Sequence, residues 1–238
     1  MKTNITTLFE TYRVLIDNRE NSTKIFENSG MKNISKKLDF GFFPLGSGIF
    51  TEQSKIKEAE ISENGIMFLG NDFGTVSYFE SLKNKSEENN KTIQMLKKLN
   101  INLENTFFTN FHLGLRDNKQ HKSMTNTKKT IKFNADYEEM CYNYFLVQLE
   151  VINPKLIICL GKDVGKILSK KSDIFAKFNM KNKTYKNLFE LNEYIVETND
   201  EIFDKRRFLL MPHPSYAHLN WNEKILNLVN KEIKNACR

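Results

Sequence analysis

Four short apolar runs constrain the fold of this chain more than any other feature of its sequence. None of them shows the polar alternation of a strand with one wet face, so each is expected to be a strand buried on both faces. The runs are IMFL at 66–69, TFFT at 106–109, LIICL at 156–160 and FLLM at 208–211.

Helical patterns lie between these runs and after the last one. Apolar residues recur at helical spacing in residues 137–151, 162–168 and 221–233, and Asn220 with Glu223 is expected to cap the last helix. Alternation of strands and helices predicts an α/β fold. We expect a three-layer α/β/α sandwich around a central, mainly parallel four-stranded sheet.

A length of 238 residues fits one domain, so residues 1–238 are expected to form a single unit. Residues 1–18 have the spacing of an amphipathic helix. We therefore interpret residues 1–38 as an N-terminal helical cover and residues 39–238 as the core of the domain, which is expected to hold any functional site.

The composition narrows the class of protein. Lysine and arginine number 36 against 29 acidic residues, a net charge of +7, which fits a polyanionic partner such as nucleic acid without requiring one. The three cysteines Cys141, Cys159 and Cys237 are scattered, which argues against a disulfide framework, a metal site or an iron–sulfur cluster. No apolar stretch reaches the roughly 18 residues of a membrane span. We expect a cytoplasmic monomer without membrane contact, metal or other cofactor.

Polar groups follow each apolar run. Open α/β sheets bind ligands outside the carboxyl ends of their strands, so these groups are expected to converge on one site. They are Gly70-Asn71-Asp72, Asn110-Phe111-His112, Gly161-Lys162-Asp163 and Pro212-His213-Pro214-Ser215.

Each group also has a purely structural interpretation. Asp72 in GNDFG suits a tight turn, and Asn110 suits a turn or a cap. His213 is held between two prolines, a rigid mount for either a structural or a functional ring. Gly161 opens a helix, where it serves phosphate binding or close packing, but the other residues of a nucleotide motif are missing.

The combination is more specific than its members. GNDFG, FFTNFH, NPKLIICLGKDVGKIL and LLMPHPS occur in the order and spacing of the uracil-DNA glycosylase superfamily, which the chain resembles over about residues 40–235. The resemblance implies an enzyme that flips a damaged or modified pyrimidine out of DNA and hydrolyses its N-glycosidic bond, leaving an abasic site.

The resemblance also implies roles for individual residues. Asp72 would stabilise the cationic sugar and activate the water, and His213 would donate to the departing base. Asn110 would read the base edge. The remaining base-binding candidates are Gly70, Asn71, Phe73, Gly74 and Phe79, with Tyr78, Phe42 and Phe43 as further stacking candidates.

A second set of residues would contact the DNA itself. In the superfamily the segment after the His-Pro-Ser motif enters the duplex, and basic side chains bind phosphates. For the basic residues between positions 116 and 129, a solvated loop is the alternative. The candidates are Arg116, Lys119, Lys122, Lys128, Lys129, Ser215, Tyr216, His218 and Leu219.

The sequence departs from the best-known uracil enzymes directly after Asp72. Those enzymes carry Pro and Tyr, and that tyrosine crowds the C5 position of the pyrimidine; this chain has Phe73 and Gly74. A glycine is expected to leave that wall open. The alternative substrate is a pyrimidine modified at C5, such as a hypermodified cytosine of bacteriophage DNA, which would make the protein a defence enzyme rather than a repair enzyme.

Two further alternatives belong to other classes. A noncatalytic DNA-binding relative would keep the basic surface but would need neither Asp72 nor His213. A small-molecule enzyme on a similar sheet would show no salt-dependent DNA affinity.

Overall fold

The computed structural model describes eleven segments of the chain, separated by ten gaps. They are residues 2–4, 6–17, 20–33, 40–41, 51–52, 60–62, 65–78, 91–101, 106–117, 133–214 and 221–236.

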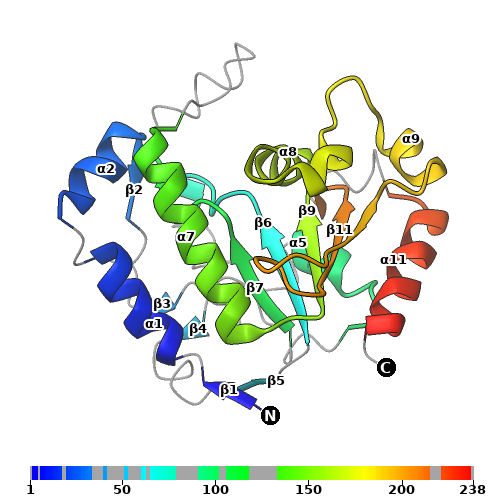
Figure 1. Ribbon diagram of the computed structural model, residues 1–238, viewed down its shortest axis with the longest axis horizontal. Helices are drawn as coiled ribbons and strands as arrows, with labels where there is room; N and C mark the ends of the chain where they lie inside the picture. Colours follow the sequence, from blue (N-terminus) through cyan, green and yellow to red (C-terminus); the bar gives the residue numbers. More distant parts are fainter. Residues whose placement is uncertain are drawn as a thin grey trace.

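A five-stranded sheet with the strand order β10-β11-β9-β6-β7 forms the centre of the fold (Figure 1). Its four parallel strands are the four apolar runs, as predicted. The prediction of four strands is wrong by one, because β10 pairs antiparallel with β11 at the edge. The bounds are β6 Ile66–Gly70, β7 Thr106–Asn110, β9 Leu156–Leu160, β10 Ile195–Glu197 and β11 Arg207–Met211.

Among the residues that the structure describes, three two-stranded pairs lie outside the central sheet, and each is antiparallel. The pairing of β2 with β8 matters most for the site, because β8 contains Arg116. The pairs are β1 Lys2–Asn4 with β5 Glu60–Ser62, β2 Met31–Lys32 with β8 Leu115–Arg116, and β3 Phe40–Gly41 with β4 Thr51–Glu52.

Helices cover the sheet, with α7 in front of it and the more distant α5 behind it in Figure 1. The predicted helices at 137–151 and 162–168 are present as α7 and α8, each somewhat longer than expected. The bounds are α1 Thr6–Tyr12, η1 Arg13–Asp17, α2 Ser22–Asn28, α5 Lys91–Leu96, α7 Ala135–Ile152, α8 Lys162–Lys171, η4 Asp173–Phe178, α9 Tyr185–Glu190 and α11 Glu223–Ala236.

The predicted N-terminal helix is present as α1 and η1, which lie on the outer side of α7 (Figure 1). Leu8, Tyr12 and Ile16 are buried one helical turn apart. The hydroxyl of Tyr144 on α7 donates to the backbone oxygen of Leu8 at 2.8 Å. A stripe of apolar residues and one buried hydrogen bond thus fix the N-terminal segment on α7.

The start of α11 differs from the prediction. The helix begins at Glu223, and the side chain of Asn222 accepts a hydrogen bond from the backbone nitrogen of Ile225 at 3.0 Å. Asn222 therefore does the capping expected of Asn220, which lies outside the described residues. Ile225 and Val229 are buried, as the apolar pattern predicted.

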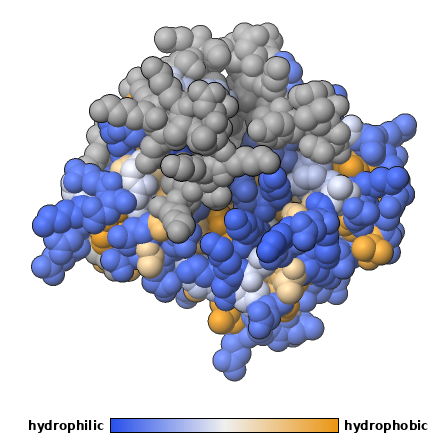
Figure 2. All heavy atoms as spheres, turned by 90° about the horizontal axis from the view of Figure 1, so that it is seen from above, coloured by the Kyte–Doolittle hydropathy of each residue, from blue (hydrophilic) through white to orange (hydrophobic). Residues whose placement is uncertain are grey.

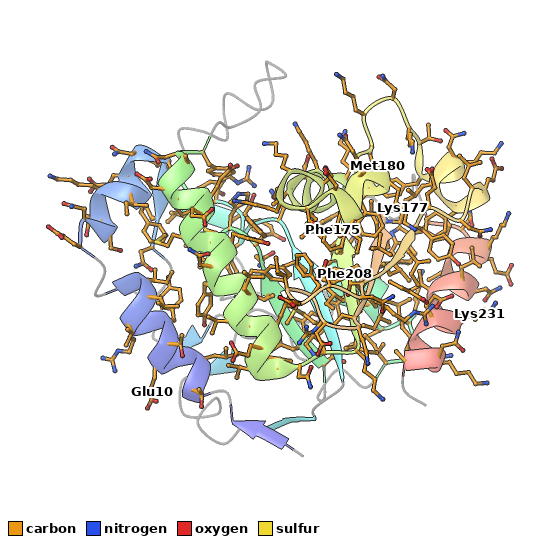
Figure 3. The ribbon with its side chains drawn as sticks, viewed as in Figure 1. Glu10, Phe175, Lys177, Met180, Phe208 and Lys231 are labelled. Carbon is orange, nitrogen blue, oxygen red and sulfur yellow. The ribbon has the colours of Figure 1, made fainter. Side chains whose placement is uncertain are left out.

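The core under α8 is aromatic. Phe175 of η4 and Phe208 of β11 point towards each other in Figure 3, and their rings meet edge to face with centroids 4.7 Å apart. Gly165 lets α8 approach this layer, because a Cβ there would lie 2.9 Å from Leu210 Cδ2. Close packing here fixes the position of α8 relative to β9 and β11.

The arrows of β6, β9 and β11 point upwards in Figure 1, so their carboxyl ends lie on the side from which Figure 2 is viewed. The coloured surface in Figure 2 is mostly hydrophilic. Within the described segments, no helix is both long and apolar enough to span a membrane.

Candidate active site

The site begins where β6 and β7 end side by side. Gly70 pairs with Asn110 at the last position of the two strands. Beyond the strands the ladder continues: Phe111 N donates to Gly70 O, and His112 N donates to Asn71 O, both at 2.9 Å. This extension holds the two predicted polar groups against each other.

Asp72 is the most heavily hydrogen-bonded side chain of this region. Its Oδ1 accepts from Gly74 N at 2.7 Å and from Arg116 Nε at 3.2 Å. Its Oδ2 accepts from Asn71 Nδ2 at 2.9 Å. The Asp72 side chain is 10% exposed. The bond to Gly74 N is the turn contact that the sequence suggested for Asp72.

His112 completes this network through Asn71. Its Nδ1 lies 3.2 Å from both Asn71 O and Asn71 Oδ1. Because a carboxylate only accepts, the bond to Asp72 fixes which end of the Asn71 amide is the donor. Both neighbours of His112 Nδ1 are then oxygens, so Nδ1 carries the proton. The sequence prediction gave His112 no role, although it follows the second strand.

Burial keeps His112 neutral. It lowers the pKa of His112 to about 4, against the opposing effects of the Asp72 charge and the Asn71 hydrogen bond, with Lys170 lowering the pKa slightly further. Its Nε2 is buried without a hydrogen-bond partner among the described residues, and its ring lies 4.0 Å from that of Phe133, centroid to centroid. A proton on Nε2 would be an orphan donor against an aromatic ring.

The free energy of unfolding should therefore decrease as the pH is lowered, and part of this decrease should depend on His112. The unfolded chain takes up this proton near pH 6.5 and the folded chain near pH 4, so stability is lost as pH falls through that window. We expect His112→Gln to remove about 2–3 kcal/mol of the stability difference between pH 7 and pH 4.5. Urea unfolding of both proteins at both pH values measures this. If the stability of the wild type and of His112→Gln changed equally between the two pH values, this role of His112 would be contradicted. The acidic residues are the same in both proteins, so the difference between them reports His112.

His213 reaches the same edge of the sheet from the end of β11. Gly161 N donates to Met211 O at 2.8 Å, and a Cβ on Gly161 would lie 3.2 Å from His213 Cβ. Gly161 also has φ +93°, a conformation that favours glycine. The glycine turn that precedes α8 thus packs against the histidine.

The electrostatic surroundings of His213 link it to the acid. Burial lowers the pKa of His213, while the negative charges of Asp72 and Asp163 act to raise it. The net shift is downward, so the ring is neutral at pH 7 and one of its nitrogens can donate. Asp72 and His213 are therefore brought together at one edge of the sheet from β6 and β11.

Asn110 lies over Gly70. A Cβ built on Gly70 would collide with the Asn110 side-chain oxygen, so the amide occupies the space that any larger residue at position 70 would need. The glycine of the first motif and the asparagine of the second are therefore sterically coupled. This places the Asn110 side chain over Gly70, two residues before Asp72 in the chain.

A comparison with known protein families identifies the family of this chain. The model of the uracil DNA glycosylase superfamily matches residues 53–234. The chain belongs to the uracil-DNA glycosylase superfamily. The resemblance inferred from the four motifs and the predicted α/β fold are thereby confirmed. A comparison with curated proteins found no match.

The superfamily consists generally of DNA glycosylases acting on damaged bases, so membership indicates a protein that acts on DNA.

The two residues that follow Asp72 differ in burial and in backbone conformation. Phe73 is 2% exposed and belongs to the hydrophobic core. Gly74 has φ +85°, and its amide is the donor to Asp72 Oδ1.

The space beside Gly74 is not empty, contrary to the expectation of an open wall. A Cβ on Gly74 would lie 3.0 Å from Cδ1 of Tyr78. Tyr78 follows on a helical turn at 76–78, where its backbone nitrogen donates to Thr75 Oγ1, and it is 48% exposed. In this superfamily member an aromatic ring four residues along the chain thus lies next to the glycine.

Several predicted site residues lie outside the described part of the chain. They are the base-binding candidate Phe79, the stacking candidates Phe42 and Phe43, and the DNA-binding candidates Lys119, Lys122, Lys128, Lys129, Ser215, Tyr216, His218 and Leu219. Arg116 is described, and its side chain contacts Asp72.

Proposed function

We propose that this protein is a DNA glycosylase that flips a damaged or modified pyrimidine out of DNA and hydrolyses its N-glycosidic bond. The observation that carries this proposal is the meeting of an oriented carboxylate, Asp72, and a neutral histidine, His213, at the carboxyl edge of a superfamily sheet. Breaking the bond makes the sugar cationic and the base anionic, which requires these two kinds of group.

The reaction can be written on these residues. Water attacks C1′ of the sugar, the bond from C1′ to the base nitrogen breaks, and its electron pair leaves with the base. Asp72 stabilises the cationic sugar and accepts the proton of the water, while His213 donates a hydrogen bond to the oxygen at C2 of the base. Asn110 supplies one acceptor and one donor for the base edge.

The net charge of +7 supports DNA as the partner. Binding should weaken steeply as salt rises, whereas a small-molecule enzyme would show no such DNA affinity. A noncatalytic DNA-binding relative is disfavoured because three hydrogen bonds orient Asp72, an arrangement that binding alone does not need.

The test is direct. The protein is incubated with oligonucleotides that contain uracil, mismatched pyrimidines or 5-substituted cytosines, single- and double-stranded, and abasic sites are detected by alkaline cleavage. We expect abasic product from at least one of these substrates. Salt-dependent DNA binding without abasic product from any of them would favour the noncatalytic alternative.

A second, narrower proposal is that the substrate carries a group on C5, as in the hypermodified bases of some bacteriophage genomes, with the half-exposed ring of Tyr78 next to Gly74 lining that position. Tyr78 would then set how large that group can be. We expect Tyr78→Ala to raise activity on large C5 groups relative to uracil by about tenfold, the effect of about 1.4 kcal/mol in a pocket contact. Tyr78→Phe keeps the ring and serves as the control. Activity of the wild type on uracil alone, unchanged in Tyr78→Ala, would contradict this substrate class.

A further inference from the structure

Arg116 is tied to the loop that carries Asp72 by its backbone. In β8 it pairs with Met31 of β2, its backbone nitrogen donates to Gly74 O at 2.8 Å, and it forms a bridge with Thr75. These contacts fix where the Arg116 side chain starts. They give it a defined approach to the carboxylate, unlike a basic residue on an exposed loop.

The side-chain contact is an ion pair with little solvent around it. Nε of Arg116 lies 3.2 Å from Asp72 Oδ1, and the two side chains are 20% and 10% exposed. An ion pair in such surroundings is screened less than a surface pair, so it can hold its geometry. The phosphate contact expected of Arg116 from the sequence would require this guanidinium to face DNA.

The two oxygens of Asp72 are occupied unequally. A carboxylate oxygen has about two lone-pair sites. Oδ1 accepts from Gly74 N and from Arg116 Nε, which fills both of its sites. Oδ2 accepts one hydrogen bond from the described residues, that of Asn71 Nδ2. Oδ2 is therefore the oxygen with capacity for a water molecule.

We propose that Arg116 is a positioning residue for Asp72, occupying Oδ1 so that Oδ2 is turned towards the attacking water. This rests on the proposed glycosylase activity. An arginine suits the task because its charge is permanent and its planar fork fixes the direction of the hydrogen bond, which a lysine does not do. The role differs from that of a phosphate contact, which would affect binding rather than the chemical step.

The proposal is tested with Arg116→Gln, which removes the charge, and Arg116→Lys, which keeps it. Single-turnover rates are measured at saturating protein, and DNA dissociation constants are measured over a range of salt. We expect Arg116→Gln to slow base release by about 10²-fold, as expected for a misplaced catalytic group, with the dissociation constant changed less than about twofold. Arg116→Lys should recover part of the rate. Lys166→Gln removes a similar charge from the exposed face of α8 and is expected to leave the rate unchanged.

A double variant separates positioning from independent action. If Arg116 acts through Asp72, then Asp72→Asn with Arg116→Gln should be no slower than Asp72→Asn alone. An unchanged rate with weaker binding and a salt slope reduced by about one would identify a phosphate contact and overturn the proposal. Rate losses that multiply in the double variant would also overturn it.

The same cycle in urea has a readout that does not need activity. The loss of stability from Arg116→Gln should shrink when Asp72 is already asparagine, because the ion pair is then absent. Equal losses in both backgrounds would contradict the pairing. If the wild-type protein releases no base from any substrate, the glycosylase proposal fails, whereas this cycle still reports whether Arg116 holds Asp72.

Discussion

Replacing Asp72 by asparagine is expected to slow base release by at least about 10³-fold while leaving DNA binding intact. General-base help contributes about 10²–10⁴ in rate, and the loss of the negative charge beside the sugar adds to it. Removing an acidic charge from a DNA-facing edge should not weaken affinity. Single-turnover base release and fluorescence anisotropy with labelled DNA measure the two quantities separately.

The change also disturbs the local hydrogen bonds. Asn71, Gly74 and Arg116 all donate to Asp72, and an asparagine can satisfy them with only one acceptor oxygen. Asp173→Asn is the matched control, since Asp173 is an exposed acid in the first turn of η4 and makes none of these contacts. We expect it to keep nearly full activity. Equal losses in the two variants would show that any acidic charge matters, rather than Asp72 itself.

Replacing His213 by alanine is expected to slow the chemical step by about 10²–10³-fold, the effect of removing one hydrogen-bond donor to a developing anion. His213→Gln, which keeps an N–H donor on a longer side chain, should recover part of this loss. Burial lowers the pKa of His213, so the ring acts in its neutral form. The wild-type rate should therefore not fall as pH rises from 6 to 8.

A fall of the rate over that pH range would mean that a protonated His213 is needed, which would contradict a neutral donor. Full activity of His213→Ala would show that His213 takes no part in the chemical step. Thermal unfolding of each variant serves as the control, because His213 packs on Gly161 and its loss also leaves a small void there.

The central sheet could be predicted because its parallel strands are buried on both faces. Such strands are continuous apolar runs, and β6 and β9 are buried at every position. β10 was not predicted, because it is not a continuous apolar run. It has three residues, Ile195–Glu197, with an exposed glutamate at one end, and its antiparallel pairing at the edge depends on β11. A segment this short carries too little pattern to be recognised.

The candidate site could be predicted in part. The strand ends indicated which polar residues lie at the carboxyl edge: Asn110 ends β7 opposite Gly70, and the charge of Asp72 acts on His213, which follows β11. The network around Asp72 could not be predicted, because it depends on contacts distant in sequence. His112 reaches Asn71 through the extended β6 and β7 ladder, and Arg116 reaches Asp72 only because β8 runs beside Gly74.

The space near Gly74 shows the same limit. From the sequence, a glycine in place of a tyrosine predicts an open wall. The structure places Tyr78 there instead, through a helical turn started by Thr75. A glycine in the sequence therefore does not show that the space beside it is empty, because a side chain from another position can occupy that space.

Release of the free base is the most direct measurement of the central claim. The wild type and Asp72→Asn are each mixed in excess with the oligonucleotide that gives abasic product, and the free base and the abasic strand are quantified by mass spectrometry over a single turnover. We predict equal amounts of base and abasic strand from the wild type, and a rate at least about 10³-fold lower from the variant. Base release at the same rate from Asp72→Asn, or none from the wild type on any substrate, would contradict the account.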